Sequence, residues 1–330
     1  MVHEIISKIL SSDSALRLRS GIARLRNRLD PFYRMNRRRE KERLMENLPY
    51  EEEQEGYWRP DIMDAEGTLK YIIENKISVA RFGDGEFEII ARHWKDMTFQ
   101  ECDEQLRKKL LFVLENPLPN CLSCVINVFG CLDRFKDPDK FFWRRTLLWL
   151  RPLANEILQN HPQVLGDPQI SRPYMPFKDS SHAMVIFDLW KKLFKNRKLL
   201  VVEGRFSRLG IGNNLFEGAS RVRRIWCPPK NAFSCYDNIV KAITSSAEPD
   251  ELILIALGQT ATIMAYDLAR IGFWAIDIGH LDVEYMWMLM GATGKVAVPG
   301  KYVNEVGEGK EMHVEDGEER RNNVVAVVGG

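Results

Sequence analysis

Two carboxylates stand two residues apart in a turn that follows a short apolar run. The segment Val79-Ala80-Arg81-Phe82-Gly83-Asp84-Gly85-Glu86-Phe87 reads as a strand that enters a tight turn. Its two glycines let the backbone turn sharply or pass close to a ligand. Asp84 and Glu86 are oxygen ligands that can converge on one divalent cation, Mn²⁺ or Mg²⁺. Arg81 can meet a phosphate or hold one of the carboxylates. The alternative is an acidic surface turn, and this segment alone leaves both open.

A second group of ionisable residues follows another apolar run. The segment Asp277-Ile278-Gly279-His280-Leu281-Asp282-Val283-Glu284 carries four ionisable side chains within eight residues. His280 can ligate a metal or bind a phosphate, and Asp282 or Glu284 can act as a general base. Because structure alone rarely demands so many such groups after a buried strand, we favour a functional role for this segment.

Two glycine-containing loops also follow apolar runs. Gly204–Asn214 contains three glycines, including Gly212, together with Ser207 and Arg208, and we expect a short helix to follow it through Ala219. Main-chain N–H groups at a helix N-terminus bind anions, so this loop suits a diphosphate. It lacks the full G-x-G-x-x-G pattern, which gives nicotinamide binding little support. Gly258-Gln259-Thr260 opens another predicted helix, where Thr260 can bind a phosphate or cap the helix.

The elements between these loops predict where the loops lie. The predicted strands are apolar throughout and alternate with helices, which is typical of a parallel sheet covered on both faces. Ligands of such sheets bind beyond the carboxyl ends of the strands. We therefore expect a Rossmann-like α/β domain that gathers these loops on one edge. The predicted strands are Ile77–Phe82, Leu122–Val128, Lys198–Val202, Arg224–Cys227, Leu252–Leu257 and Trp274–Ile278, and the predicted helices are Thr68–Asn75, Glu101–Glu115, Phe141–Gln159, Ala183–Phe194, Tyr236–Ser245 and 261–271.

Composition and charge narrow the class of protein. The chain has 330 residues, 45% of them hydrophobic, which is enough for a large core. Its formal net charge of +1 argues against a nucleic-acid binder. It shows neither an apolar run long enough for a bilayer nor the pattern of a signal peptide. Six cysteines in apolar segments favour a reduced, cytoplasmic protein, and we interpret Cys121 and Cys124 as buried thiols rather than zinc ligands.

The N-terminal 58 residues differ from the rest. Residues 1–45 carry twelve Lys and Arg against five Asp and Glu, a net charge of +7, with Ile and Leu at roughly helical spacing. Such a basic amphipathic helix can lie on an anionic membrane surface, or it can pack on the main domain or a partner, including a second copy of the chain. An acidic run at 51–55 marks a linker. We expect the main domain at 59–307 and a charged, poorly ordered tail at 308–330.

Seven short segments form an ordered set from residue 81 to residue 305. They are Arg81-Phe82-Gly83-Asp84-Gly85-Glu86, Ser171-Arg172-Pro173-Tyr174, Gly210-Ile211-Gly212-Asn213-Asn214-Leu215-Phe216, Pro228-x-Lys230-Asn231-Ala232-Phe233, Leu257-Gly258-Gln259-Thr260-Ala261, Asp277-Ile278-Gly279-His280 and Lys301-Tyr302-Val303-Asn304-Glu305. In these segments the sequence resembles bacterial glycosyltransferases of the GT-D fold family, over about Asp64 to Glu305.

This resemblance implies a Rossmann-like domain of GT-D type that uses a nucleotide sugar, typically a UDP-hexose, and a divalent metal such as manganese. Asp84 and Glu86 would serve the metal and the donor diphosphate. Other residues of the implied donor site are Arg81, Gly83, Asn127, Arg172, Tyr174, Ser207, Arg208, Gly212, Asn213, Asn231, Gly258 and Thr260. Asn214 and Gln259 depart from the residues expected in relatives, an acidic residue and a proline, which leaves the donor sugar open.

We therefore expect a metal-dependent cytoplasmic glycosyltransferase that moves a hexose to a glycan acceptor. The acceptor is either lipid-linked, at the inner face of the membrane, or carried by a protein. A bound divalent ion would neutralise the leaving diphosphate. Two alternatives use the same residues: a metal-dependent phosphohydrolase of nucleotide or sugar phosphates, and a non-catalytic nucleotide-binding module.

Overall fold

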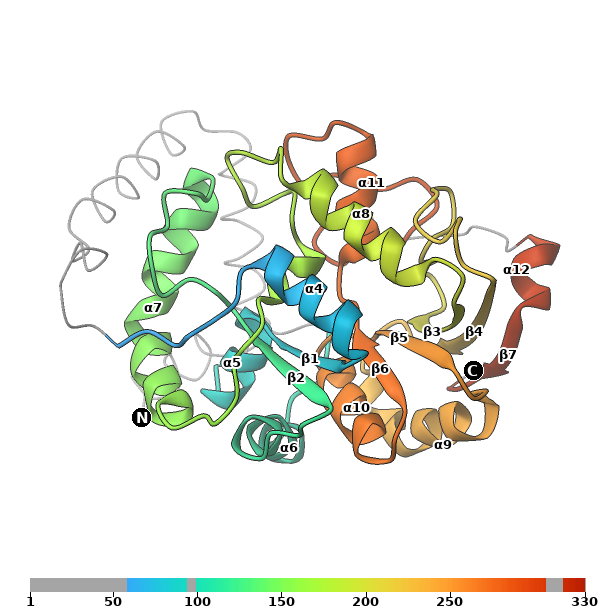
Figure 1. Cartoon of the computed structure of the whole chain (residues 1–330), viewed down its shortest axis with the longest axis horizontal. Helices are drawn as coiled ribbons and strands as arrows, with labels where there is room; N and C mark the ends of the chain where they lie inside the picture. Colours follow the sequence, from blue (N-terminus) through green and yellow to red (C-terminus); the bar gives the residue numbers. More distant parts are fainter. Residues whose placement is uncertain (1–57, 94–98, 307–316, 330) are drawn as a thin grey trace, which may run out of the picture. The chain divides into compact units, whose positions relative to one another are not determined.

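The computed structural model describes residues 58–93, 99–306 and 317–329. These residues contain one seven-stranded sheet in the order β2-β1-β6-β5-β3-β4-β7, and all neighbouring strands are parallel (Figure 1). The predicted α/β sheet is therefore confirmed. The predicted basic helix and acidic linker lie outside the described residues. The strands are β1 Ser78–Phe82, β2 Cys121–Val125, β3 Lys198–Gly204, β4 Arg221–Cys227, β5 Glu251–Ala256, β6 Trp274–Asp277 and β7 Val324–Val327.

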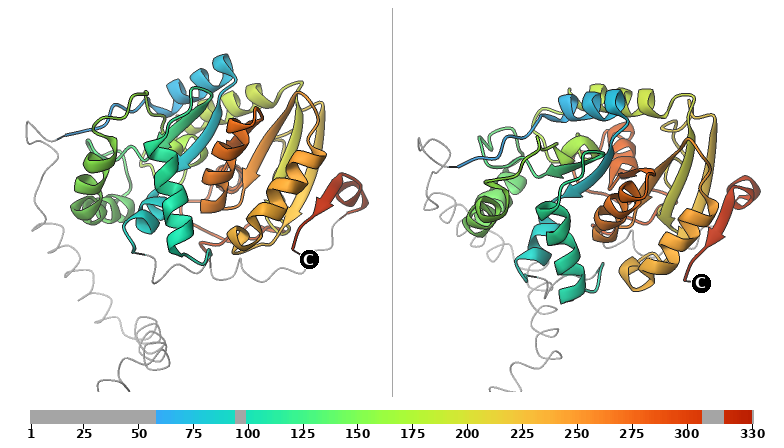
Figure 2. Two further views of the ribbon diagram at one scale, coloured as in Figure 1. Left: turned by 90° about the horizontal axis from the view of Figure 1, so that it is seen from below. Right: turned by 60° about the horizontal axis from the view of Figure 1, so that its bottom comes forward.

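Helices cover both faces of the sheet because the strand side chains point alternately to either face (Figures 1 and 2). In β3, Leu200 and Val202 belong to one hydrophobic cluster, whereas Leu199 and Val201 belong to another. The first cluster includes α5 Asp84–Ile90, α6 Glu104–Glu115, α7 Asp137–Leu158, α9 Tyr236–Ser246 and α10 Gln259–Arg270, and the second includes α4 Ala65–Asn75, α8 Ala183–Phe194 and α11 Leu281–Leu289.

The same alternation explains the two cysteines of β2. Cys121 belongs to the first hydrophobic cluster and Cys124 to the second, so their buried thiols point to opposite faces of the sheet. Two thiols on opposite faces cannot bind one zinc ion. Burial raises the pKa of Cys121 to about 12. The interpretation as buried thiols is confirmed.

The segment after β3 is not helical, and the prediction of a short helix through Ala219 is wrong. Residues 205–219 form a series of turns. Arg208, Gly210 and Gly212 have φ angles of +52°, +68° and +76°, which a right-handed helix does not contain. A Cβ atom at Gly210 would lie 2.2 Å from the ring of Phe216, so this turn requires glycine. The expected helix N-terminus for a diphosphate is therefore absent from this loop.

The last described segment is more ordered than the tail that the sequence predicts. Residues 317–329 contain α12 Glu318–Asn322 and the strand β7, which pairs with β4. Arg320 is 5% exposed and lies 3.3 Å from the carboxylate of Glu203. It also donates to the main-chain oxygen of Arg205 at 2.7 Å. This segment is thus attached to the loop that follows β3. Residues 308–316 of the predicted tail lie outside the described residues.

None of the helices in the described ranges is long and apolar enough to cross a membrane.

Candidate active site

Asp84 and Glu86 lie where β1 ends and α5 begins, at the carboxyl edge of the sheet. The Oε2 atom of Glu86 accepts a hydrogen bond from the N–H of Gly83 at 2.8 Å, which fixes this carboxylate in the first turn of α5. Burial, and then the negative charge of Asp277, raise the pKa of Glu86 to about 7. Asp84 is exposed. The two carboxylates therefore stand at the edge where parallel sheets bind ligands.

Arg81 connects β1 to the end of β6. Its guanidinium donates to the Oδ1 atom of Asp277 at 2.8 Å and to the main-chain oxygen of the same residue at 3.0 Å. It also donates to the hydroxyl of Ser171 at 2.6 Å. Gly279 has a φ of +51°, and a Cβ atom there would lie 2.0 Å from Nη2 of Arg81. The carboxylate that Arg81 holds is thus that of Asp277, and not one of the predicted pair, Asp84 and Glu86.

A mixed-charge cluster lies beyond the end of β6. The Nη2 atom of Arg172 donates to Nδ1 of His280 at 3.0 Å and pairs with the carboxylate of Glu305. The partial burial of the ring, and then the positive charge of Arg172, lower the pKa of His280 to about 3, so its imidazole is neutral at pH 7. The charge of Asp84 also acts on Arg172. The structure therefore brings Arg172 and His280 to the same region as Asp84.

Glu284 is fully buried next to this cluster. Its Oε2 atom accepts hydrogen bonds from the main-chain N–H groups of Tyr174, at 3.1 Å, and Met175, at 2.8 Å. Its other oxygen lies 3.9 Å from Nη1 of Arg172. Burial raises the pKa of Glu284. An enclosed carboxylate with these partners anchors the loop that carries Arg172 and Tyr174, a position that does not suit a general base.

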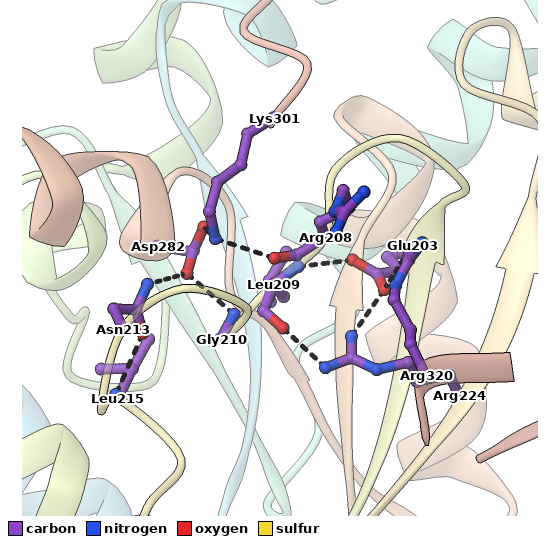
Figure 3. Close-up of polar contacts among 10 residues, drawn as sticks. All are labelled: Glu203, Arg208, Leu209, Gly210, Asn213, Leu215, Arg224, Asp282, Lys301 and Arg320. Atoms are coloured by element: carbon purple, nitrogen blue, oxygen red, sulfur yellow. Dashed lines mark hydrogen bonds and ion pairs between the residues drawn. The ribbon is translucent and has the colours of Figure 1, made fainter. Parts of the chain in front are cut away.

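Asp282 is also enclosed, with 2% exposure (Figure 3). Its Oδ1 atom accepts from the N–H of Gly210 and from Nδ2 of Asn213, both at 2.8 Å. Its Oδ2 atom lies 2.6 Å from Nζ of Lys301, which also donates to the main-chain oxygen of Arg208 at 2.8 Å. Asp282 and Lys301 together hold the turn from Arg208 to Asn213. The carboxylate is therefore occupied by structural partners.

A second buried ion pair holds the same turn from β3 and β4 (Figure 3). Glu203 and Arg224 lie 2.6 Å apart, and both bind the main chain of Leu209, through its N–H and its oxygen, at 2.7 Å each. Ser207 takes part in a turn through its N–H, which donates to the oxygen of Gly204 at 2.8 Å. Gly212 is exposed.

Two other predicted site residues, Asn231 and Thr260, come together through Gln100, which is 1% exposed. The side chain of Gln100 donates to Oδ1 of Asn231 at 2.7 Å and accepts from the hydroxyl of Thr260 at 3.1 Å. Gly258 has a φ of +57°, and a Cβ atom there would lie 2.5 Å from the ring of Phe99. These contacts connect the ends of β4 and β5.

Asn127 follows β2, where its main-chain oxygen accepts a hydrogen bond from Arg134. Its side chain bonds to the buried carboxylate of Asp167. Burial raises the pKa of Asp167 to about 6. The contacts of Asn127 are therefore with Arg134 and Asp167, and they do not include the Arg172 cluster.

A family model described as glycosyltransferase GT-D fold matches residues 79–306. The chain belongs to the GT-D fold family of glycosyltransferases. It is 34% identical over 267 residues to a probable glycosyl transferase, Gly, of Streptococcus gordonii, and 34% identical over 270 residues to the glycosyltransferase GlyD of Streptococcus pneumoniae. These matches cover 80% and 81% of this chain but 38% and 33% of the relatives, so the chain spans about a third of their length.

Two solved structures that are similar to this chain agree with this assignment. One, described as a highly conserved domain of unknown function with a distinct glycosyltransferase fold, has a TM-score of 0.74 at 37% identity. The match covers 82% of this chain and 96% of that one. A second, described as a new glycosyltransferase from Streptococcus sanguinis, has a TM-score of 0.74 at 32% identity, over 82% of this chain and 100% of the other.

Asp84 and Glu86 suit a divalent cation whose remaining ligands come from a bound substrate and water. Among the residues that the structure describes, no group of three or more His, Cys, Asp and Glu side chains could hold a metal ion. Asp84 and Glu86 supply two carboxylates, the donors that Mn²⁺ and Mg²⁺ prefer. Mg²⁺ often binds through one or two carboxylates together with substrate phosphates and water. The donor set therefore suits such a cation but does not enclose it.

Lys295 and Gln100 were not predicted as site residues, and Lys301 and Glu305 were predicted only as parts of a motif. Glu305 closes the cluster around Arg172, and Lys295 lies 2.5 Å from it. Gln100 and Lys295 carry no local signal, because their partners are far away in the sequence. For Glu305 and Lys301 the available signal was their place in the last of the seven segments that resemble the GT-D family.

Proposed function

We propose that this chain transfers a hexose from a nucleotide sugar, with UDP as the nucleotide, to a glycan acceptor, and that it uses Mn²⁺ or Mg²⁺. One observation carries the proposal: carboxylates suited to a cation and an arginine suited to a phosphate share one edge of the sheet. The charge of Asp84 acts on Arg172 across this edge. Membership of the GT-D family supports sugar transfer as the reaction.

The roles of the residues follow from their surroundings. When bound, the divalent ion would neutralise the diphosphate as its bond to the sugar breaks. Asp84 is exposed and can turn toward such an ion, whereas Glu86 keeps its orientation through the N–H of Gly83. Arg172 can stabilise the negative charge that develops on the departing phosphate. Since Nδ1 of His280 accepts a hydrogen bond, its other ring nitrogen carries the proton and can donate to the same anion.

The proposal also covers the glycan acceptor and the place in the cell where the chain acts. Residues 1–45, with a net charge of +7, suit an anionic membrane surface and hence a lipid-linked acceptor at the inner face of the membrane. A protein-borne glycan is the alternative acceptor, and self-association through this segment is a further expectation. Deletion of residues 1–58 tests the membrane version, which predicts loss of vesicle binding and of activity on the lipid-linked acceptor.

Incubation with UDP-hexoses, Mn²⁺ and a glycan acceptor tests the reaction itself. Transfer of the sugar supports the proposal, whereas release of phosphate without transfer supports a phosphohydrolase. Asp84→Asn and Glu86→Gln should each abolish nearly all transfer, and the exposed Glu115→Gln on α6 is a matched control that should retain it. Full activity in both variants would overturn the proposed roles. A rise in melting temperature with UDP-hexose and Mn²⁺ would show donor binding separately.

A further inference from the structure

The carboxylate of Glu305 is surrounded by nitrogen donors from three separate segments. Arg172 pairs with its Oε1 atom, and Nε2 of His280 lies 3.3 Å from the same oxygen. Nζ of Lys295 lies 2.5 Å from Oε2. These donors come from the end of the 168–171 turn, the loop after β6 and the segment after α11. A single carboxylate thus receives two positive charges and a ring nitrogen.

The protonation of His280 makes it a donor in this arrangement. Its Nδ1 atom accepts the hydrogen bond from Arg172, so a neutral ring carries its proton on Nε2. Nε2 is the atom that faces Glu305. The three groups around Glu305 therefore all offer hydrogen to an anion.

Glu305 and Glu284, the two carboxylates next to Arg172, are held in different ways. Glu284 is fully buried and bound by two main-chain N–H groups. Within the described ranges, the carboxylate of Glu305 contacts side chains only. Because it has no main-chain anchor there, Glu305 can leave by rotating its side chain. Its three partners are between 30% and 44% exposed, so a ligand can reach them from solvent.

Charge balance gives the chemical class of that ligand. Arg172 and Lys295 contribute two positive charges, and Glu284 and Glu305 contribute two negative charges. A phosphate entering while Glu305 stays in place would make the group strongly negative, next to Asp84. Two positive groups and a neutral N–H donor are the partners that a phosphate requires.

We propose that Arg172, His280 and Lys295 form a phosphate-binding site that Glu305 fills until a phosphate-bearing ligand displaces it. This inference deepens the proposed function, on which it rests for the origin of the phosphate. The phosphate belongs either to the nucleotide-sugar donor or to the diphosphate of a lipid-linked acceptor. In both cases Glu305 competes with the ligand, so its removal strengthens binding.

Isothermal titration of the full chain with UDP, in the presence of EDTA, tests this competition without turnover or metal. Glu305→Gln keeps the shape of the side chain and removes its charge. We expect it to bind UDP about tenfold more tightly or better, because the ligand no longer has to displace a carboxylate that is paired with Arg172 and Lys295. The exposed Glu217→Gln is the matched control for net charge and should bind as the wild type does. If a folded Glu305→Gln variant binds neither UDP nor geranyl diphosphate more tightly than the wild type does, the proposal is overturned.

A second variant and a second ligand complete the test. Lys295→Met removes a donor and should weaken binding about tenfold. This test does not depend on whether Glu305→Gln folds. Unchanged affinity of Lys295→Met would also contradict the proposal. Geranyl diphosphate replaces UDP in parallel titrations. Tightening for UDP assigns the site to the donor, and tightening for geranyl diphosphate alone assigns it to a lipid-linked acceptor. These titrations measure binding and not sugar transfer. A failure of the phosphate-site proposal can therefore be told apart from a failure of the proposed reaction.

Discussion

Asp282 and Lys301 form an ion pair that is almost fully enclosed, with 2.6 Å between Oδ2 and Nζ and 2% exposure of each residue. An ion pair buried in this way adds little net stability, because both charges lose their hydration. Loss of one partner is costly, because the other stays buried without compensation. The pair also bonds to Arg208, Gly210 and Asn213, so its role here is to fix the turn after β3.

Lys301→Met should therefore lower the free energy of unfolding by about 3–5 kcal/mol, measured by urea denaturation. The double variant Asp282→Asn/Lys301→Met should be more stable than Lys301→Met alone, since no unpaired charge remains. Lys178→Met is the control, because Lys178 is half exposed and its pair with Asp137 spans 3.5 Å. It should change stability by less than about 1 kcal/mol. If Lys301→Met and Lys178→Met lower the free energy of unfolding equally, the role assigned to the enclosed ion pair is wrong.

Gly279→Ala should displace the guanidinium of Arg81 from Asp277. The added Cβ would lie 2.0 Å from Nη2 of Arg81, in a backbone with φ of +51°. Gly291→Ala separates strain from collision, because Gly291 has a similar φ of +60° and nothing within 4 Å of an added Cβ. We expect both variants to lose on the order of 1 kcal/mol through backbone strain, and Gly279→Ala to lose clearly more. Identical melting temperatures would show that Arg81 moves aside at no cost.

Arg320→Ala tests the attachment of the last described segment. The substitution removes the bonds of Arg320 to Glu203 and to the main chain of Arg205. We expect a loss of about 1.5–3 kcal/mol, the usual effect of losing a hydrogen bond to a charged group. Arg321→Ala removes the exposed neighbour and should have little effect. If both variants melt at the wild-type temperature, the bonds of Arg320 do not stabilise the loop.

The neutral imidazole of His280 predicts a dependence of stability on pH. Its pKa is about 3 in the folded chain and has an ordinary value of 6.5. Between these values the unfolded chain binds a proton that the folded chain does not, so stability falls as the pH decreases below about 6.5. His280→Asn should remove this contribution. The difference in unfolding free energy between wild type and His280→Asn should therefore shrink from pH 7.5 to pH 5, and a constant difference would contradict the neutral ring.

The sequence predicts the parallel sheet because both faces of its strands are covered. The first five residues of β5, for example, are buried without alternation. The strand order was not predictable in this way, since β1 pairs with β6, which lies near the other end of the domain in the sequence. β7 escaped prediction because it is a four-residue edge strand in which only alternate residues are partly buried. A run of four apolar residues such as Val324–Val327 is too short to be identified as a strand from the sequence alone.

The location of a site residue was predictable where it depends only on the loop that carries the residue. Asp84 and His280 follow strands, so the topology alone sends them to the carboxyl edge. The surroundings of Asp282 and Glu284 were not predictable, because they depend on which side chains α11 turns inward. Their partners, Lys301 for Asp282 and the main chain of Tyr174 and Met175 for Glu284, come from loops that no local pattern connects to them.

The place of β6 in the sheet also bears on how the chain acquires its site during synthesis. β1 and β2 are made early, but β1 meets the rest of the sheet through β6, which begins at Trp274. Until β6 has been synthesised, β1 and β5 each expose an unpaired edge. Arg81 also lacks its partner Asp277 until then. Such long-range pairing slows folding and leaves intermediates open to aggregation. The candidate active site can thus form only late, when nearly the whole domain has been made.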